Sequence, residues 1–332
     1  MPNARIARAA AASLAVVALA AGCSSSRSGA SPSTAGLGGG QNLTPPSVRL
    51  FQAACSGWLK VTNAGTVTDP AIDEASGIAA SRANPGEWWV HNDSGDSARF
   101  FLIDGSAKVR ATVEVDGATA HDWEDIAVGA PYRAPTGGSV YLADIGDNGA
   151  MKPNGTTRPD IQVYRVTEPV VPKGAAPTTL HVTAEKFTFT YPDGGHDAET
   201  LMVDPATNDL LIVTKNWSLL GRSSIYRAPA DLKPGSTTVL QKVGDVKVPR
   251  ATLVTGGDIS TDGSVIALRS YTAVRLYKRT AGQSVAAALG SKPCTGPRPR
   301  EKQGEAIGFA LDGASYATIS EGTDPVLHLT RR

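Results

Sequence analysis

The stretch His121-Asp122-Trp123-Glu124-Asp125-Ile126-Ala127 joins spaced acids to the start of an apolar run, and weaker copies of it recur along the chain. The shared pattern is an acidic or polar residue, any residue, a second such residue, any residue, and then Ile or Leu. Four copies follow it: Glu74-x-Ser76-x-Ile78, Asp122-x-Glu124-x-Ile126, Asp197-x-Glu199-x-Leu201 and Gln303-x-Glu305-x-Ile307. A degraded copy keeps Asp258 directly before Ile259. We therefore interpret the stretch as one unit of a repeat.

The repeat has the period of a propeller blade. Its apolar anchors at residues 78, 126, 201, 259 and 307 lie 48, 75, 58 and 48 residues apart. The intervals hold short runs of β-forming residues, and no long segment has helical periodicity. A unit of about 45–50 residues with four strands is typical of β-propellers. The sequence thus predicts an all-β protein, a β-propeller of five four-stranded blades. Six blades, a pair of β-sandwiches and a helical protein are the alternatives.

Closure of the ring is expected to use the N-terminal strand. The last unit has only three strand-like runs, and the orphan run Gly57–Val61 can complete it and remove the exposed sheet edges. Cys55 and Cys294 are the only cysteines of the predicted domain. An exported domain with two cysteines most simply forms one disulfide, here beside the seam. Two free buried thiols are the alternative.

The first 47 residues are typical of an export signal and a tether. Arg5 and Arg8 precede the uncharged apolar run Ala9–Ala21, which is too short to span a bilayer as a helix. The run leads into Leu-Ala-Ala-Gly-Cys23, which resembles a bacterial lipobox with a lipidated cysteine; an ordinary signal peptide is the alternative. We expect a lipoprotein signal peptide over 1–22, a flexible Ser/Gly/Pro tether over 23–47 and one propeller domain over 48–332. The protein would be exported and lipid-anchored to the outer face of the bacterial cell membrane.

Charge is nearly balanced, with 32 Lys and Arg against 31 Asp and Glu. A general nucleic-acid binder would show a strong basic excess, so this class of function is disfavoured. The expected partners are the membrane, through the anchor, and a protein or small-molecule ligand at a face of the propeller. We expect a monomer.

The repeated acids are expected to converge. The innermost strand of each propeller blade lines the central channel, so residues at its start should surround one mouth. Like charges held close together cannot all ionise without a compensating cation, and Ca²⁺ prefers carboxylate oxygens. The candidate metal ligands are Glu74, Asp122, Glu124, Asp144, Asp197, Glu199, Asp258 and Glu305. Lys215 and Arg269 are expected to reach inward, where they would form salt bridges or bind an anion. Alternatively, the acids only bond turns and neighbouring blades together.

Two histidines precede the first acid of a repeat, in His121-Asp-Trp-Glu and His196-Asp-Ala-Glu. A histidine beside carboxylates can serve as the general base of a metal-dependent hydrolase. The candidate catalytic residues are His121, Glu124, His196 and Glu199. The alternative is that each histidine only caps the neighbouring carboxylate.

Four motifs together resemble a known group of proteins: Glu-Ala-Ser-Gly-Ile (74–78), Trp-Val-His-Asn-Asp-Ser-Gly (89–95), Trp-Glu-Asp-Ile-Ala (123–127) and Ala-Asp-Ile-Gly-Asp-Asn (143–148). They resemble secreted bacterial propellers of the SdiA-regulated and phytase-like (esterase-like) groups, over most of residues 74–322. The resemblance implies an extracytoplasmic propeller with a Ca²⁺ site at Glu74, Glu124, Glu199 and Glu305. The fourth repeat departs from it, because Gly257-Asp258 stands in place of the glutamate.

Two functions of different classes follow from these observations. The first is a membrane-anchored binding or scaffold protein with an acidic, Ca²⁺-binding channel. The second is a metal-dependent hydrolase of phosphate or carboxylic esters.

Overall fold

The computed structural model describes residues 44–131, 136–152, 154–216 and 221–332. The predicted signal peptide, Cys23 and almost all of the predicted tether lie outside these residues. Residues 43–332 form one compact unit. Its first element is the helix α1 (Pro46–Cys55), which begins two residues before the predicted domain boundary at residue 48. Among the described residues, no helix is both long and apolar enough to cross a membrane.

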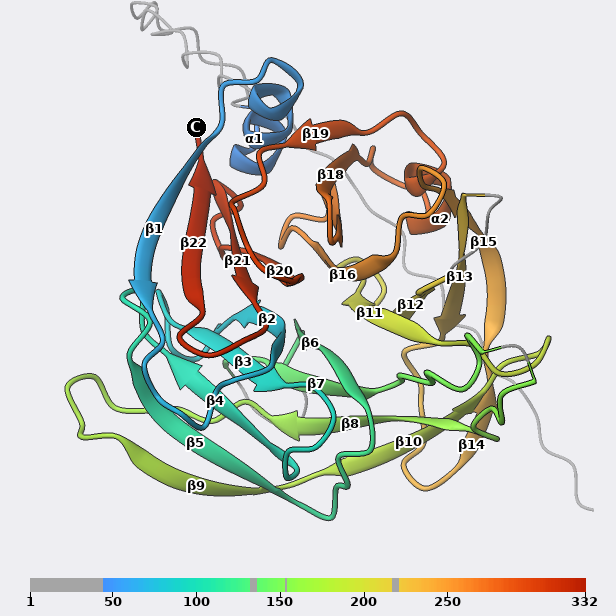
Figure 1. Cartoon of the computed structure of the whole chain (residues 1–332), viewed down its shortest axis with the longest axis horizontal. Helices are drawn as coiled ribbons and strands as arrows, with labels where there is room; N and C mark the ends of the chain where they lie inside the picture. Colours follow the sequence, from blue (N-terminus) through green and yellow to red (C-terminus); the bar gives the residue numbers. More distant parts are fainter. Residues whose placement is uncertain (1–43, 132–135, 153, 217–220) are drawn as a thin grey trace, which may run out of the picture. The chain divides into compact units, whose positions relative to one another are not determined.

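Five small β-sheets surround a common axis, which confirms the predicted five-bladed propeller (Figure 1). Blade 1 comprises β2 (Ala75–Ala80), β3 (Trp88–Asn92), β4 (Arg99–Ile103) and β5 (Val109–Asp116). Blade 2 comprises β6 (Trp123–Gly129), β7 (Ser139–Asp144), β8 (Ile161–Thr167) and β10 (Glu185–Thr190). Blade 3 comprises β11 (Ala198–Val203), β12 (Leu210–Thr214), β13 (Arg222–Ala228) and β15 (Gln241–Lys247). Blade 4 comprises β16 (Val254–Ile259), β17 (Val265–Ser270), β18 (Ala273–Lys278) and β19 (Cys294–Gly296). Blade 5 comprises β20 (Gly304–Phe309), β21 (Ser315–Ser320), β22 (Val326–Arg331) and β1 (Lys60–Thr66).

An N-terminal strand closes the ring as predicted, but this strand, β1 (Lys60–Thr66), begins three residues later than the predicted run Gly57–Val61. β1 pairs antiparallel with β22, from Lys60 opposite Arg331 to Thr66 opposite Val326. The predicted disulfide between Cys55 and Cys294 is present, with 4.8 Å between the two Cα atoms. It ties the end of α1 to β19 of blade 4. The chain ends are thereby held on two neighbouring blades.

Three elements depart from the simple order of four strands per blade. β14 (Thr237–Val239) follows β13 of blade 3 in the chain but pairs in parallel with β10 of blade 2. The chain after β18 forms the short helix α2 (Val285–Leu289), which begins at the capping hydroxyl of Ser284. Within the long second interval, β9 (Thr178–Thr183) joins β5 of blade 1 in parallel. Blades 1 and 2 each gain a fifth outer strand from a later blade.

The apolar cores lie between adjacent blades. Middle strands such as β7 and β12 are buried along their whole length, because neighbouring blades cover both of their faces. Tyr141 and Phe187 of blade 2 pack with Leu201 and Ile212 of blade 3 in one such core. Outer strands such as β5 alternate between buried and more exposed residues, because one face contacts water.

Candidate functional site

A β-bulge recurs at the same position in all five inner strands. The register shifts beside one residue of each strand, and these residues are Ser76, Glu124, Glu199, Thr255 and Glu305. A bulge re-aims a side chain that would otherwise follow the pleat. Three of the five bulged residues are buried glutamates. The repeated sequence pattern thus marks the position of a β-bulge in each inner strand, and the bulge sets the direction in which these acidic side chains point.

Three carboxylates from two blades meet at this end of the inner strands. Asp93 follows β3 of blade 1, while Asp122 and Glu124 belong to the start of β6 in blade 2. One oxygen of each lies within 4.8 Å of the others. A Cβ atom on Gly146 would overlap carboxylate oxygens of both Asp122 and Glu124, so only glycine fits beside this pair. Asp93 was not among the predicted metal ligands, although the cluster Asn-Asp-Ser-Gly-Asp around it pointed to a polar strand end.

Further acids surround these three. Asp197 and Glu199 of blade 3 are buried, and so is Glu305 of blade 5. Glu321, directly after β21, interacts electrostatically with Glu305 and Asp93. We call the seven residues Asp93, Asp122, Glu124, Asp197, Glu199, Glu305 and Glu321 the acidic cluster.

The acidic cluster resists ionisation. Burial, followed by the charge of Asp93, raises the pKa of Asp122 to about 6. Burial raises the pKa of Asp93 to about 6 as well, although the Ser94 amide opposes the shift. The pKa of Glu124 is raised well above its usual value by burial, Asp93 and Asp122. Burial and Glu305 raise the pKa of Glu321 to about 8. Protons or a bound cation must therefore offset the negative charge.

Several buried carboxylate oxygens of the site have no hydrogen-bond partner within the described chain. They are Asp197 Oδ2, Glu199 Oε2, Glu305 Oε2 and Asp144 Oδ2. Burying such an acceptor without a partner costs free energy, so these atoms are available to a ligand. Lys215 supplies the cation that was predicted to reach inward: it forms an ion pair with Glu199, and its Nζ lies 5.5 Å from the centre of the Tyr271 ring.

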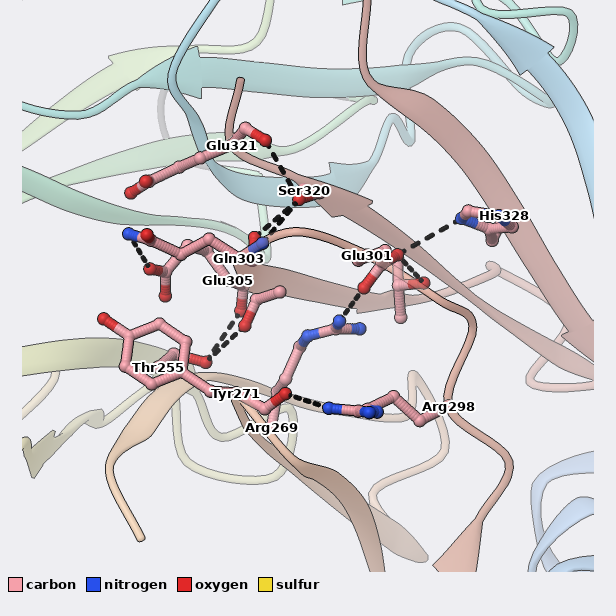
Figure 2. A network of polar contacts seen from close by, with 12 residues as sticks. Thr255, Arg269, Tyr271, Arg298, Glu301, Gln303, Glu305, Ser320, Glu321 and His328 are labelled. Carbon is pink, nitrogen blue, oxygen red and sulfur yellow. Dashed lines mark hydrogen bonds and ion pairs between the residues drawn. The ribbon is translucent and has the colours of Figure 1, made fainter. Parts of the chain in front are cut away.

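Blades 4 and 5 contribute a group of polar side chains on the same side (Figure 2). The head groups of Gln303, Glu305, Glu321 and Tyr271 gather together there, and Gln303 Nε2 donates to Glu305 Oε1 at 3.0 Å. Burial raises the pKa of Glu305, whereas Lys215 and Gln303 oppose that shift. Gln303 replaces the acid of the other repeats and satisfies one oxygen of Glu305.

Arg269 was predicted to reach inward and either form salt bridges or bind an anion, and it forms a salt bridge with Glu301. Figure 2 shows its guanidinium turned toward Glu301, with which it forms an ion pair. The side chain is fully buried, and its burial lowers the pKa of Arg269 to about 10. Glu301 Oε1 also accepts a hydrogen bond from Thr318 Oγ1 at 3.1 Å. Arg269 pairs blade 4 with blade 5 and offers no surface to a ligand.

Three predicted metal ligands lie outside the converging group of Asp93, Asp122 and Glu124. Asp258 accepts the amides of Ile259 and Phe309, each at 2.7 Å, and so joins blade 4 to blade 5. The bulge at Thr255 makes Gly257, rather than Ile259, the anchor of the fourth repeat, which explains why Asp258 points away from the other acids. Asp144 forms a 2.8 Å salt bridge with Arg158. Glu74 is exposed, its backbone carbonyl accepts the Asp93 amide, and its charge contributes to the raised pKa of Asp93 and of Glu321.

Asp125, inside the stretch that defines the repeat, plays the same structural part as Asp258. Its carboxylate accepts the amide of Ile126 at 2.9 Å and that of Leu201, in the next blade, at 2.9 Å. The expected alternative, that acids bond neighbouring blades together, therefore holds for Asp125 and Asp258.

The two histidines occupy different settings. His121 is exposed beside Asp122. His196 is held by Asp193 at 3.0 Å and by the Tyr226 hydroxyl at 2.8 Å, both through Nε2. Tyr226 in turn donates to Asp193 at 2.7 Å. Nε2 of His196 is thus already engaged by two partners.

Two cavities adjoin the acidic cluster through Lys215. A cavity of about 500 Å³ is lined by Met151 and Lys152 from the loop after β7 and by Leu253 and Tyr271 of blade 4. A second, of about 300 Å³, is lined by His196 and Asp197. The loop after β7 therefore reaches from blade 2 across to residues of blade 4. A ligand of moderate size has room beside the carboxylates.

In the presence of EDTA, Asp122→Asn is expected to raise the free energy of unfolding at about pH 8 and to raise it less at about pH 5. The pKa of Asp122 in the folded protein, about 6, exceeds its ordinary value of 3.8. Its protonated form therefore favours the fold at low pH, and that contribution is lost as the pH rises through about 6. Allowing for water at the site, we expect a gain of about 1–2 kcal/mol at the higher pH. Urea unfolding at both pH values measures it, with exposed Asp116→Asn as the control. An effect that does not change with pH would contradict the electrostatic argument.

Comparison of the chain with protein-family models and with curated proteins finds no match.

Proposed function

We propose that this chain is an exported, lipid-anchored β-propeller that binds a divalent cation, Ca²⁺ in particular, at its acidic cluster and presents that end to a small-molecule or protein ligand. The observation that carries the proposal is the meeting of Asp93, Asp122 and Glu124 within 4.8 Å. The unpartnered oxygens of Asp197, Glu199 and Glu305 supply further donors of the same kind. The lipobox-like sequence before Cys23 and the resemblance to secreted propellers support export and anchoring.

The donor set fits Ca²⁺ better than other metals. Every candidate ligand is a carboxylate oxygen, and Ca²⁺ takes six to eight oxygens in flexible geometry, whereas Zn²⁺ prefers His and Cys. Mg²⁺ demands near-octahedral geometry and gives up water reluctantly. A bound cation would remove the repulsion among Asp93, Asp122 and Glu124. Lys215, which pairs with Glu199 and lines both adjoining cavities, would also hold an anionic group of the ligand there.

Calcium is expected to raise the melting temperature of the protein, because a ligand that binds only the folded state stabilises it. At a free concentration about 100 times the dissociation constant, the gain is about 2.7 kcal/mol, or several degrees. Glu124→Gln should abolish the shift. Asp116→Asn is the control: Asp116 is an exposed acid at the end of β5, outside the acidic cluster, so the shift should persist. Differential scanning calorimetry with Ca²⁺, Mg²⁺ or EDTA measures the effect. No shift with Ca²⁺ and none with EDTA would overturn the cation site.

Hydrolysis of phosphate or carboxylic esters is the second candidate, and the spread of acidities favours it. Burial and the neighbouring acids raise the pKa of Glu124 well above its usual value, while the pKa of Asp122 is raised to about 6. Two carboxyls with separated pKa values can act as acid and base. Ester hydrolysis that persists in EDTA and disappears in Glu124→Gln would replace cation binding as the function of these residues.

A further inference from the structure

Three chain segments meet at the seam where the ring closes. They are residues 44–66, which contain α1 and β1, residues 291–300, which contain β19, and residues 325–332, which contain β22. The disulfide joins the first segment to the second, and the pairing of β1 with β22 joins it to the third. We call the outer face of these segments the seam surface. Figure 1 shows α1, β1, β19 and the C-terminal end along one edge of the ring.

The three segments that form the seam surface carry charged side chains of one sign, although the exposed acid Asp262 contacts α1. The three segments contain seven basic residues and no Asp or Glu: Arg49, Lys60, Lys292, Arg298, Arg300, Arg331 and Arg332. All seven side chains are exposed. Basic and acidic residues are almost equal in number over the whole chain, so this is a strong local imbalance.

The basic residues of the seam surface are not neutralised within the described part of the protein, where none of the seven forms an ion pair with an acid. Arg298 donates only to the backbone carbonyl of Tyr271. Asp262 contacts α1, but its carboxylate accepts hydrogen bonds from the hydroxyls of Ser47 and Ser264 and, among the described residues, forms no ion pair with the basic residues of the seam surface. Lys60 and Arg331 stand directly opposite each other across β1 and β22, an arrangement of like charges that weakens a sheet. The presence of two like charges at these positions therefore does not stabilise the fold.

An exposed tryptophan lies in the same surface. Trp58 is 63 % exposed, while Leu59 is buried and Lys60 is exposed. This alternation directs Trp58 and Lys60 to the same, outer side. Tryptophan with flanking basic residues is typical of protein surfaces that rest in the headgroup region of a membrane.

We propose that the seam surface docks on an anionic lipid surface and holds the propeller by its edge against the membrane. The chain leading from Cys23 enters the structure at residue 44, directly before α1, on this same surface. A flexible tether of about 20 residues has a mean reach of about 25 Å, so an anchor at Cys23 would keep the seam surface within contact distance. Basic residues near an anionic membrane each strengthen binding about five-fold. Edge-on docking also keeps the acidic cluster from facing the like-charged membrane.

The test uses the chain from residue 23 with Cys23→Ser, which retains the whole compact unit and removes the lipid, so it does not depend on lipid attachment. Binding to phosphatidylcholine vesicles with and without phosphatidylglycerol is measured by flotation. We expect binding only to the anionic vesicles, and its loss at high salt. Lys60→Gln with Arg331→Gln should weaken binding about 25-fold. Trp58→Ala should weaken it further, and calorimetry verifies that each variant is folded.

A matched pair of exposed lysines provides the control. Lys108→Gln with Lys173→Gln removes the same charge from exposed positions outside the seam surface and should leave binding within about two-fold. Equal binding to both kinds of vesicle, or an equal loss in the control pair, overturns the proposal. Binding to dextran sulfate without binding to anionic vesicles also overturns it, because the seam surface would then serve a soluble polyanion.

Discussion

Glu168→Ala is expected to lower the free energy of unfolding by about 3 kcal/mol. Glu168 follows β8 of blade 2, is 5 % exposed, and reaches into blade 1. Its Oε1 accepts hydrogen bonds from Ser81 Oγ at 2.7 Å, the Arg82 amide at 2.8 Å and Trp89 Nε1 at 2.8 Å. Alanine would leave three donors at a blade interface with no acceptor. Each unpaired buried donor costs about 1–3 kcal/mol, and water entering the vacated space recovers part of that cost.

Two further variants serve as controls for Glu168→Ala. Glu168→Gln keeps a carbonyl oxygen for the same donors but loses its charge, so we expect about half the effect of alanine. Asp116→Ala removes an exposed acid at the end of β5 and should change stability by less than about 0.5 kcal/mol. Equilibrium unfolding in urea measures all three. If the alanine variant were as stable as Asp116→Ala, the link between blades 1 and 2 would have to lie in the apolar contacts and not in Glu168.

Removing the Cys55–Cys294 disulfide is expected to cost about 2–5 kcal/mol. The two cysteines are 239 residues apart, so the bridge restricts almost the entire unfolded domain. A loop of that length gives about 5 kcal/mol in the chain-entropy account, and measured values usually fall below it. Loss of the bridge also frees α1 from β19, which leaves β1 and its pairing with β22 as the main closure of the ring.

The Cys55→Ser, Cys294→Ser double variant tests the bridge without chemical reduction. Its unfolding midpoint in guanidinium chloride should match that of the wild type treated with dithiothreitol, and dithiothreitol should leave the variant unchanged. Cys23→Ser is included in both proteins, so that the remaining thiol cannot contribute. Equal stability of oxidised wild type and double variant would show that strand pairing alone closes the ring.

The repeated sequence pattern was sufficient to predict the five-bladed architecture. Each inner strand begins with the same short pattern, and the period of that pattern reflects one four-stranded unit. The closing strand and the disulfide were predictable because a ring leaves one strand unpaired and the domain has only two cysteines. The outer strands were not predictable in the same way. β9 and β14 join a blade other than the one before them in the chain, and strand propensity carries no information about which sheet edge accepts a strand.

The sequence predicted that acidic side chains would gather at one end of the inner strands, but it did not predict which acids belong to the cluster. Spacing identified Asp122, Glu124, Asp197, Glu199 and Glu305, all buried together at one end of the inner strands. Spacing alone could not separate them from Asp258, because a one-residue change of register turns a side chain to the other face of a strand. Nor could it show that Arg269 would be buried against Glu301, since residues distant in sequence decide that contact.

The repeated pattern around His121–Ala127 thus determined by itself that the chain forms a ring of similar blades, because hydrophobic period and strand propensity are local properties. Only the tertiary structure decided that Asp93 joins Asp122 and Glu124, while Asp125 and Asp258 bond neighbouring blades. The physical reason is that a β-bulge and the approach of an adjacent blade set the direction and the charge state of each acid. Both depend on contacts between segments that lie far apart in the chain.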